Sequence, residues 1–321
     1  MKTRFTELVG VEHPIQCGTM QWLSRAELVA AVANAGGFAC LAAATFPGAG
    51  ELAREIRKTR RLTNKPFGVN VSLFPSLRPQ TIESLIDVAV TEGVGIIETA
   101  GRNPEPYRGR IIEAGLIHVH KCARVRDAMK ADRLGVDAVA VVGAESGGHP
   151  GMEGISSMVL FPMAADAIKA PLILGGGLCD GRSLMAALCL GADAVVMGTR
   201  FLCTRECIAH PRVKERLLAA GAVDTTLVLA SFRNPGRVLK NRWAEKVLEM
   251  ERACASFEEL APAVRGEVSC RGWLEGCVDE ALFSCGQVVG RIKDVPTVSE
   301  LMKIILEEAR LVQARMDQLK K

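Results

Sequence analysis

Short apolar runs alternate with longer segments in which apolar residues recur at helical spacing, from Pro14 to about residue 200. The unit repeats about every 25 residues, which is typical of strands followed by helices in a parallel sheet. The helix after the first run is predicted to begin at Ser24, an N-cap residue with Glu27 three positions later. Eight runs are predicted to be strands: residues 15–17, 38–42, 67–72, 96–99, 117–121, 138–142, 172–175 and 194–198.

Eight strand–helix units favour a closed (β/α)8 TIM barrel, of class α/β, over an open doubly wound sheet. We expect the barrel to occupy residues 1–200. The pattern then changes, and residues 201–321 are predicted to form a C-terminal helical extension or lid that packs on the barrel. Because such barrels place their active sites at the C-terminal ends of the strands, the residues that follow each run are the functional candidates.

Composition narrows the class of protein. The 321 residues are 49% hydrophobic but only 4% aromatic, which suits helices packed closely on a buried sheet. The net charge of +4 comes from interspersed groups, so we expect no nucleic-acid partner. The N-terminus lacks the apolar region of a secretion signal, and no apolar run approaches the ~20 residues of a membrane span. We therefore expect a cytoplasmic protein without a membrane partner.

Metal sites and several common hydrolytic chemistries lack their signatures. The eleven cysteines show no C-x-x-C spacing and are expected to be reduced and structural. His118 and His120 share one face of a predicted strand, but no carboxylate accompanies them, and we expect no metal. The sequence also lacks G-x-S-x-G, a Walker-type loop and H-E-x-x-H, the motifs of serine hydrolysis, P-loop phosphoryl transfer and zincin proteolysis.

The loops after the seventh and eighth predicted strands are both rich in glycine. In a β/α barrel these loops often bind a phosphate through backbone N–H groups and a helix N-terminus. Glycines that only turn corners would look the same in the sequence, but two such loops at this place favour a phosphorylated ligand. The residues expected to bind it are Gly175, Gly176, Gly177, Gly198 and Thr199.

Polar residues also end other strands. Lys121 ends the fifth, and a lysine that points into a barrel mouth requires a negative partner, whereas a solvated surface lysine is the alternative. Asn70 and Ser72 lie two positions apart, so they share a face. They either address the edge of a heterocycle or form a polar pair at the rim whose hydrogen bonds are already satisfied. The end of the first strand can meet a flat ring through backbone groups and a thioether: Gly18, Thr19 and Met20.

The segments "GVEHPIQCGTMQW", "FGVNVSL", "IHVHKC", "ESGGHPG", "LGGGLCDGRS" and "GADAVVMGTRFLCTRE" together resemble the nitronate monooxygenase family, once called 2-nitropropane dioxygenases. The match is close to members that act as NADH:quinone reductases. The resemblance implies an FMN-containing TIM barrel, with the end of the first strand against the isoalloxazine and the third-strand pair at its polar edge. It places Lys121 by N1 and the C2 carbonyl, and Gly147 and Gly148 on the flavin side of the histidine loop. The glycines after strands seven and eight, with Thr199, would hold the phosphate.

The resemblance also places His149 near the flavin, where a neutral imidazole takes an α-proton or orients an ionised nitronate. A histidine that only hydrogen-bonds its loop is the alternative. The leading expected activity is oxidation of alkyl nitronates with dioxygen. The second is NAD(P)H-dependent reduction of a quinone or an enoyl thioester, and the third is a non-catalytic flavin-binding barrel. Whether two chains assemble as a homodimer stays open.

Two segments depart from the family pattern. Cys17 and Thr19 stand in "QCGTM", where relatives commonly have a second glycine before Met. A third glycine in "LGGGL" replaces the serine of a phosphate loop. The lost hydroxyl contact is worth about 1 kcal/mol. We therefore expect FMN to bind, but less securely than in relatives.

Overall fold

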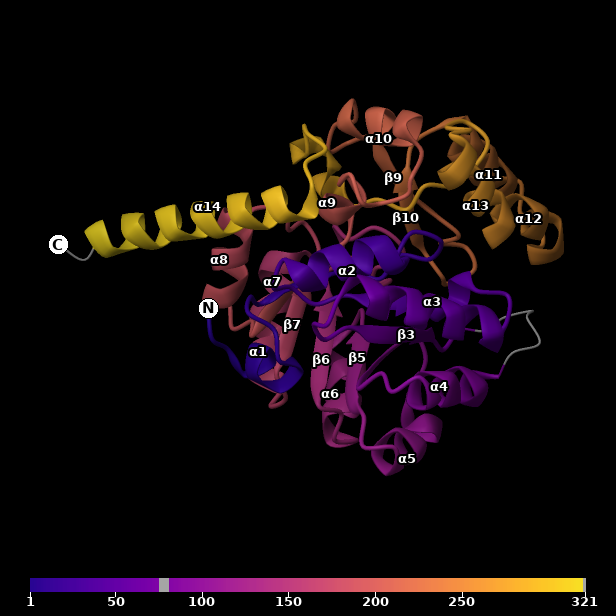
Figure 1. Ribbon diagram of the computed structural model, residues 1–321. Coiled ribbons are helices and arrows are strands. Elements are labelled where there is room, and N and C mark those ends of the chain that lie inside the picture. Colours follow the sequence, from indigo (N-terminus) through magenta and orange to yellow (C-terminus); the bar gives the residue numbers. More distant parts are fainter. Residues whose placement is uncertain (75–80, 320–321) are drawn as a thin grey trace.

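The computed structural model describes residues 1–74 and 81–319 and shows the predicted (β/α)8 barrel (Figure 1). Each predicted strand is present, with ends shifted by no more than two residues. The barrel closes between the first strand of the chain and the residues just before the second. There Cys17 N donates to Phe38 O at 2.8 Å, and Phe38 N donates to Ile15 O at 2.9 Å. Around the sheet the order is β1 (Ile15–Cys17), β8 (Ala194–Met197), β7 (Leu172–Gly175), β6 (Ala138–Val142), β5 (Ile117–Cys122), β4 (Ile96–Ala100), β3 (Gly68–Ser72) and β2 (Cys40–Ala42).

Helices cover the outside of the strands. The prediction that the first of them begins at Ser24 is wrong: α2 has Arg25 as its N-cap, and Ser24 Oγ instead accepts a hydrogen bond from Met20 N at 2.9 Å. Ser24 therefore fixes the turn after β1. The outer helices are α2 (Ala26–Asn34), α3 (Ala49–Leu62), α4 (Ile82–Thr91), α5 (Glu105–Glu113), α6 (Val125–Arg133), α7 (Ser157–Ala167) and α8 (Gly181–Cys189).

Two apolar layers stabilise the barrel. The interior is filled from alternate strand positions, for example Ile96, Val119 and Ile173, and by Phe5 from the short helix α1 (Arg4–Val9). The intervening strand positions face outward and pack against the helices in a second, larger cluster. Because α1 precedes β1 and fills the N-terminal end of the barrel, the C-terminal end of the strands is left for a ligand.

The extension contains a hairpin that the sequence interpretation missed. β9 (Thr225–Val228) and β10 (Gly236–Leu239) pair antiparallel between α10 (Pro211–Leu218) and α11 (Arg242–Arg252). Together with α11 and α12 (Phe257–Val264), the hairpin encloses a small apolar cluster of its own. In Figure 1 these elements, with α13 (Gly266–Glu275), lie together on one side of the barrel.

The predicted amphipathic helix near the C-terminus is present as α14 (Val298–Gln318). It packs along α8 and against α2, with Leu301, Ile305 and Ala309 on its buried face. Glu308 from this helix accepts a hydrogen bond from Gly181 N, the first amide of α8, at 2.8 Å. The far end of α14 extends past the barrel (Figure 1).

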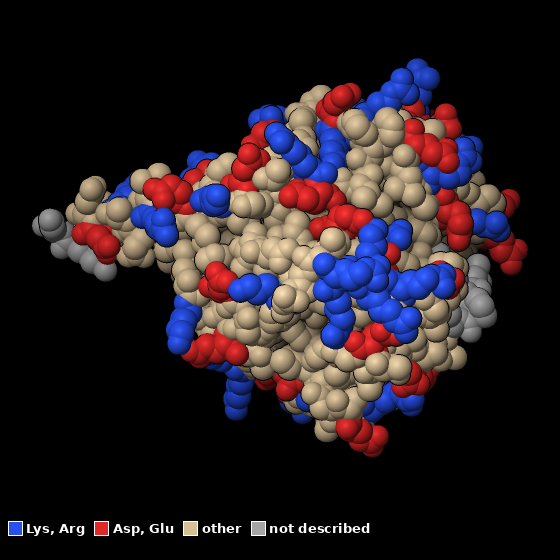
Figure 2. Space-filling view, in the orientation of Figure 1, with Lys and Arg blue, Asp and Glu red and all other residues tan. Residues whose placement is uncertain are grey.

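Figure 2 shows Lys and Arg side chains gathered over α3, a cluster that the sequence interpretation did not single out. Several of these groups have acidic partners, so the cluster is largely neutralised: the pairs are Arg54–Glu51, Arg57–Glu92 and Lys58–Glu27. Among the described helices, none is both long enough and apolar enough to pass through a bilayer.

Candidate active site

The C-terminal ends of the strands meet at one rim, which we call the barrel mouth: the residues that end or follow β1, β3, β5, β6, β7 and β8. Lys121 lies here, two positions after Val119 on β5. Since the Val119 side chain is inside the barrel, Lys121 points to the same side. Its ammonium group makes neither a hydrogen bond nor an ion pair with any described residue. An unpartnered cation at this place favours an anionic or electron-rich ligand.

The loops after β7 and β8 present unpaired backbone donors. No described residue accepts a hydrogen bond from the amides of Gly177 or Gly198, whereas Gly176 directly follows the last residue pair of the β7–β8 ladder, Gly175 with Val196. β7 and β8 are paired neighbours, so these amides and Thr199 lie at the same rim, as the sequence predicts. Backbone N–H groups are rarely left unpaired, and unpaired N–H groups that lie close together are suited to bind an anion.

Only part of this glycine set faces open space. A Cβ on Gly175 would collide with Val196, and one on Gly176 would lie 2.9 Å from Gly143 N. Packing within the chain therefore already explains these two glycines. A Cβ on Gly198 would meet no protein atom within 4 Å, although Gly18 approaches the Gly198 backbone from β1. The phosphate role of the set stays a prediction, and Gly198 is where room remains for a ligand.

Thr199 begins the short helix α9 (Thr199–Leu202). Its Oγ1 accepts a hydrogen bond from Gly286 N at 2.9 Å, so the hydroxyl proton remains available to donate. The start of α8 is already occupied, because its first amides donate to Asp180 and Glu308. The helix N-terminus that the sequence expects beside the phosphate loop is therefore not that of α8.

His149 lies in the histidine loop, residues 143–156, between β6 and α7. The extension holds this loop: Gly148 N donates to Arg237 O at 3.1 Å, and Arg237 N donates to Gly148 O at 2.6 Å. Arg237 Nε also donates to Ala144 O at 3.1 Å. A Cβ on Gly147 would lie 2.6 Å from the backbone of Cys285. Gly147 thus allows a segment of this chain to approach the loop, whereas Gly148, with φ of +75°, has open space beside it.

The His149 ring lies 5.3 Å from the Phe74 ring, centroid to centroid, and remains accessible to solvent. The protein atoms around it are nevertheless dense enough to lower its pKa by desolvation, and the nearby Lys121 charge lowers that pKa further. The neutral imidazole, which can accept a proton, therefore predominates near neutral pH.

A buried carboxylate lies below the mouth, and the sequence interpretation missed it. Glu98 on β4 has 0% exposed surface. Its carboxylate accepts hydrogen bonds from Gln16 Nε2 at 2.5 Å, Asn70 Nδ2 at 2.6 Å and Thr19 Oγ1 at 2.9 Å. Asn70 and Thr19 were expected to address a ligand, but their donor atoms bind Glu98. Ser72 does share the inward face of β3 with Asn70, as expected from their spacing.

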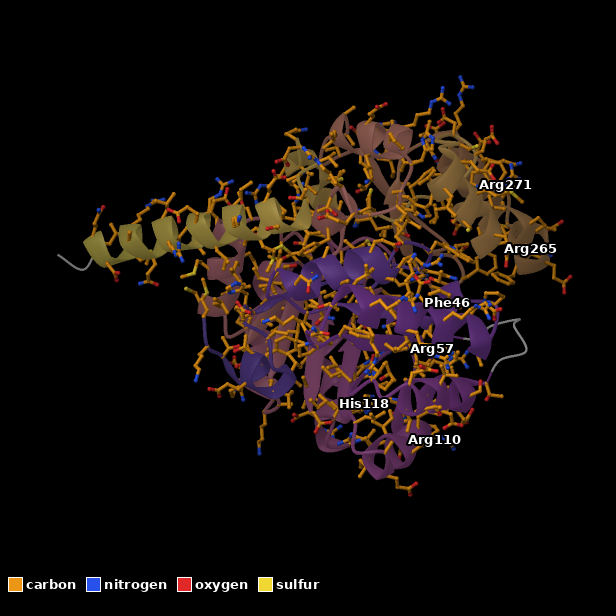
Figure 3. All side chains as sticks on the ribbon, viewed as in Figure 1. Phe46, Arg57, Arg110, His118, Arg265 and Arg271 are labelled. Atoms are coloured by element: carbon orange, nitrogen blue, oxygen red, sulfur yellow. The ribbon has the colours of Figure 1, made fainter. Side chains whose placement is uncertain are left out.

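His118 and His120 face outward, on the side of β5 opposite to Lys121. Thr99 Oγ1 lies 2.7 Å from a ring nitrogen of each. Burial lowers the pKa of His118 to about 3 and that of His120 to about 4. Figure 3 shows His118 in the part of the barrel near α5, away from the extension. Over residues 1–74 and 81–319, no group of three or more potential metal ligands occurs. The two rings and Thr99 form a buried polar cluster in the barrel wall.

The mouth fits a flavin mononucleotide in charge and in hydrogen bonding. The unpaired amides after β7 and β8 suit a phosphate, and Gly198 leaves space beside them. Lys121 is an unpartnered cation suited to the electron-rich N1 and C2 carbonyl edge of a flavin. Gly18 and the partly buried Met20 follow β1 at the same rim.

The chain is similar to known proteins over most of its length. A family model described as nitronate monooxygenase matches residues 2–308. A (3aS,4S,5R,7aS)-5-hydroxy-7a-methyl-1-oxo-octahydro-1H-indene-4-carboxyl-CoA dehydrogenase of Rhodococcus jostii is 33% identical, over 96% of this chain and 96% of its own. A probable nitronate monooxygenase of Staphylococcus aureus is 28% identical, over 82% and 86%. The structure of FabK from Thermotoga maritima has a TM-score of 0.89 and 33% identity, over 99% of both chains.

Proposed function

Since the chain belongs to the nitronate monooxygenase family and is an oxidoreductase, we propose that it is an FMN-dependent enzyme that acts on a coenzyme A thioester. The observation that supports a flavin most strongly is the unpartnered Lys121 at the same rim as the unpaired amides of Gly177 and Gly198. The thioester is supported by the Rhodococcus relative, which matches nearly the whole chain and is named for a carboxyl-CoA substrate.

When bound, FMN supplies the two-electron chemistry. The chain's own residues bind and orient FMN and the substrate. The amides after β7 and β8 hold the phosphate, and Lys121 keeps a fixed positive charge where negative charge gathers during reduction. His149, neutral near pH 7, moves the proton at the carbon next to the thioester carbonyl. Arg237 and Gly148 keep the histidine loop in place for this transfer.

A mostly apolar depression beside the histidine loop supports the same substrate class. A ligand with an apolar body and anionic groups, such as a coenzyme A ester, matches such a surface when cations lie at its edge. Its lining combines aliphatic side chains with charges of both signs: Val125, Val142, Ile155 and Met163, with Arg124, Arg126 and Glu153. Arg124 is paired with Asp127, so Arg126 is the cation that would meet an anionic group.

Nitronate oxidation is the second candidate, and the Staphylococcus relative favours it. A nitronate and the enolate of a thioester are both carbanions stabilised by neighbouring oxygens, so the same His149 and Lys121 can serve either substrate. Use of NAD(P)H as electron donor and of a quinone as acceptor stay predictions. Family membership among oxidoreductases leaves no support for the non-catalytic barrel.

The test is anaerobic mixing of the FMN-loaded protein with single reactants, followed by the visible absorbance of the flavin. Three reactants are compared: an acyl-CoA with an α-proton, a nitronate, and NADH or NADPH. Rapid bleaching by the acyl-CoA, or reoxidation of the NAD(P)H-reduced flavin by an enoyl-CoA, is the expected result. Bleaching by the nitronate alone would transfer the assignment to the second candidate. A flavin that responds to none of these reactants contradicts the proposal.

A further inference from the structure

The Glu98 carboxylate is an unusual group to bury. It lies inside the barrel on β4, and none of the described cations forms an ion pair with it. A buried charge without a counter-ion is strongly unfavourable unless hydrogen bonds satisfy it. Here three uncharged donors do so, at 2.5 to 2.9 Å, from Gln16, Thr19 and Asn70. They come from β1, the turn after it, and β3, so the carboxylate links β1, β3 and β4 directly below the mouth.

The carboxylate also fixes the polarity of its neighbours. An ionised carboxylate only accepts hydrogen bonds, so each neighbour must turn a donor toward it. The amide of Asn70 therefore points Nδ2 at Glu98 and keeps Oδ1 as an acceptor, to which no described residue donates. Gln16 is held in the same way, and its buried Oε1 lacks a partner. The layer below the mouth thus presents acceptors rather than donors.

This pattern complements one edge of a flavin. The pyrimidine edge of an oxidised isoalloxazine has one donor, N3–H, between two carbonyl acceptors. An asparagine held as an acceptor matches the donor, and an amide free to rotate would offer either group. Lys121 lies across the β4–β5 pair, opposite Ala100, one inward position farther toward the mouth than Glu98. The mouth thus combines a cation at the rim with an anion below it.

We infer that Glu98 is a positioning residue that holds Asn70 as a hydrogen-bond acceptor for the flavin and places a negative charge beneath it. The inference rests on the proposed FMN-dependent function and adds a role for the buried carboxylate. A negative charge below the ring disfavours the anionic reduced flavin, so Glu98 lowers the reduction potential of the bound cofactor. Lys121 acts in the opposite direction, and the two charges together set the potential.

The test substitutes Glu98→Gln, which keeps the shape of the side chain but removes the charge and brings a donor of its own. At least one neighbouring amide must then rotate. We expect reduced FMN to gain affinity relative to oxidised FMN by about tenfold, which equals a midpoint potential higher by ~30 mV for a two-electron couple. The potential is measured by equilibration with reference dyes, and the dissociation constant of oxidised FMN by quenching of its fluorescence.

Glu55→Gln is the matched control. Glu55 on α3 is also buried, at 6% exposure, and accepts hydrogen bonds from Arg25 Nε and Ala26 N, both at 2.9 Å. It lies on the helix layer outside the barrel, so its loss is expected to lower thermal stability without moving the flavin potential. A merely structural role for Glu98 would give the same result as this control.

Glu98→Asp keeps the charge but shortens the side chain by one methylene. It is the second test variant if Glu98→Gln fails to fold. It is expected to leave the potential near that of the wild type and to weaken FMN binding several-fold. An unchanged potential in folded Glu98→Gln overturns the inference, as does unchanged FMN affinity in Glu98→Asp. If the wild-type protein itself binds no FMN, the proposed function fails and the inference fails with it. Normal FMN binding with unaffected variants refutes the inference alone.

Discussion

Substitution of Gly198 by alanine is expected to change ligand affinity and folding stability in opposite directions. Gly198 has φ of −90° and ψ of −69°, which alanine adopts readily, and its added Cβ would meet no protein atom within 4 Å. Gly198→Ala is therefore expected to stabilise the protein without ligand by about 0.4 to 1 kcal/mol, because the unfolded chain loses conformational freedom. The same methyl group would enter the space beside the unpaired amides. The variant is therefore expected to be more stable but to bind FMN more weakly. A glycine required only for folding would not combine these two effects.

The expected loss of affinity follows from the amide itself. A hydrogen bond to a charged group contributes about 1.5 to 3 kcal/mol, and each 1.4 kcal/mol is about tenfold in affinity. If the methyl displaces the phosphate from the Gly198 amide, FMN should bind roughly 10- to 150-fold more weakly. The dissociation constant is measured by fluorescence quenching of FMN, and stability by urea unfolding of the protein without ligand.

Gly109→Ala is the control for this prediction. Gly109 lies within α5, and its Cβ would also meet no atom within 4 Å. Alanine there should stabilise the helix by about 1 kcal/mol and leave FMN binding unchanged. If Gly198→Ala behaves like this control, with higher stability and full affinity, the phosphate does not lie beside Gly198 and the reasoning is refuted.

Three further predictions concern titration and the histidine loop. Because the folded-state pKa values of His118 and His120, about 3 and 4, lie below the ordinary value of 6.5, their stabilising contribution is present above pH 6.5 and is lost as the pH falls toward 4 and then 3. From pH 7 to 5 the free energy of unfolding should fall by about 2 kcal/mol for each histidine. The double variant His118→Gln/His120→Gln should lose this part of the pH dependence, which urea unfolding at each pH measures. An unchanged pH dependence would contradict the assignment. Lys121→Met should raise the pKa of His149, because the lysine charge lowers it, as followed by NMR titration of the ring; no change would show that the two groups are not coupled. Arg237→Gln should speed amide hydrogen exchange in residues 144–149 by about tenfold, since one anchoring hydrogen bond is lost, and unchanged exchange would mean that the backbone pairing alone holds the loop.

The sequence was sufficient for the barrel because its strands are buried on both faces and therefore appear as apolar runs of the right length and spacing. Their order also places Gly176, Thr199 and Lys121 at one rim, since parallel strands all end on the same side. Side-chain direction along β5 followed from alternation alone. These features depend on local pattern and on a regular architecture.

What the sequence interpretation missed depends on contacts between distant residues. Glu98 is one acid within the apolar run "IIETA", a signal that inward alternation could have revealed, but its donors Gln16 and Asn70 lie 82 and 28 residues away. The hairpin of the extension had a turn signal, "NPG", between two apolar runs. Its pairing with Gly148 had none, because Arg237 comes from outside the barrel. Gly147 and Gly175 were predicted to contact a ligand, but close contacts within the chain also require glycine at both positions.

The position of the phosphorus atom in a crystal structure of the protein with FMN tests the proposed site most directly. The phosphate is expected within hydrogen-bond distance of the amides of Gly177 and Gly198, with the isoalloxazine extending toward Lys121 and His149. A flavin bound at another surface, or one with its phosphate on the Lys121 side of the mouth, would contradict the assignment.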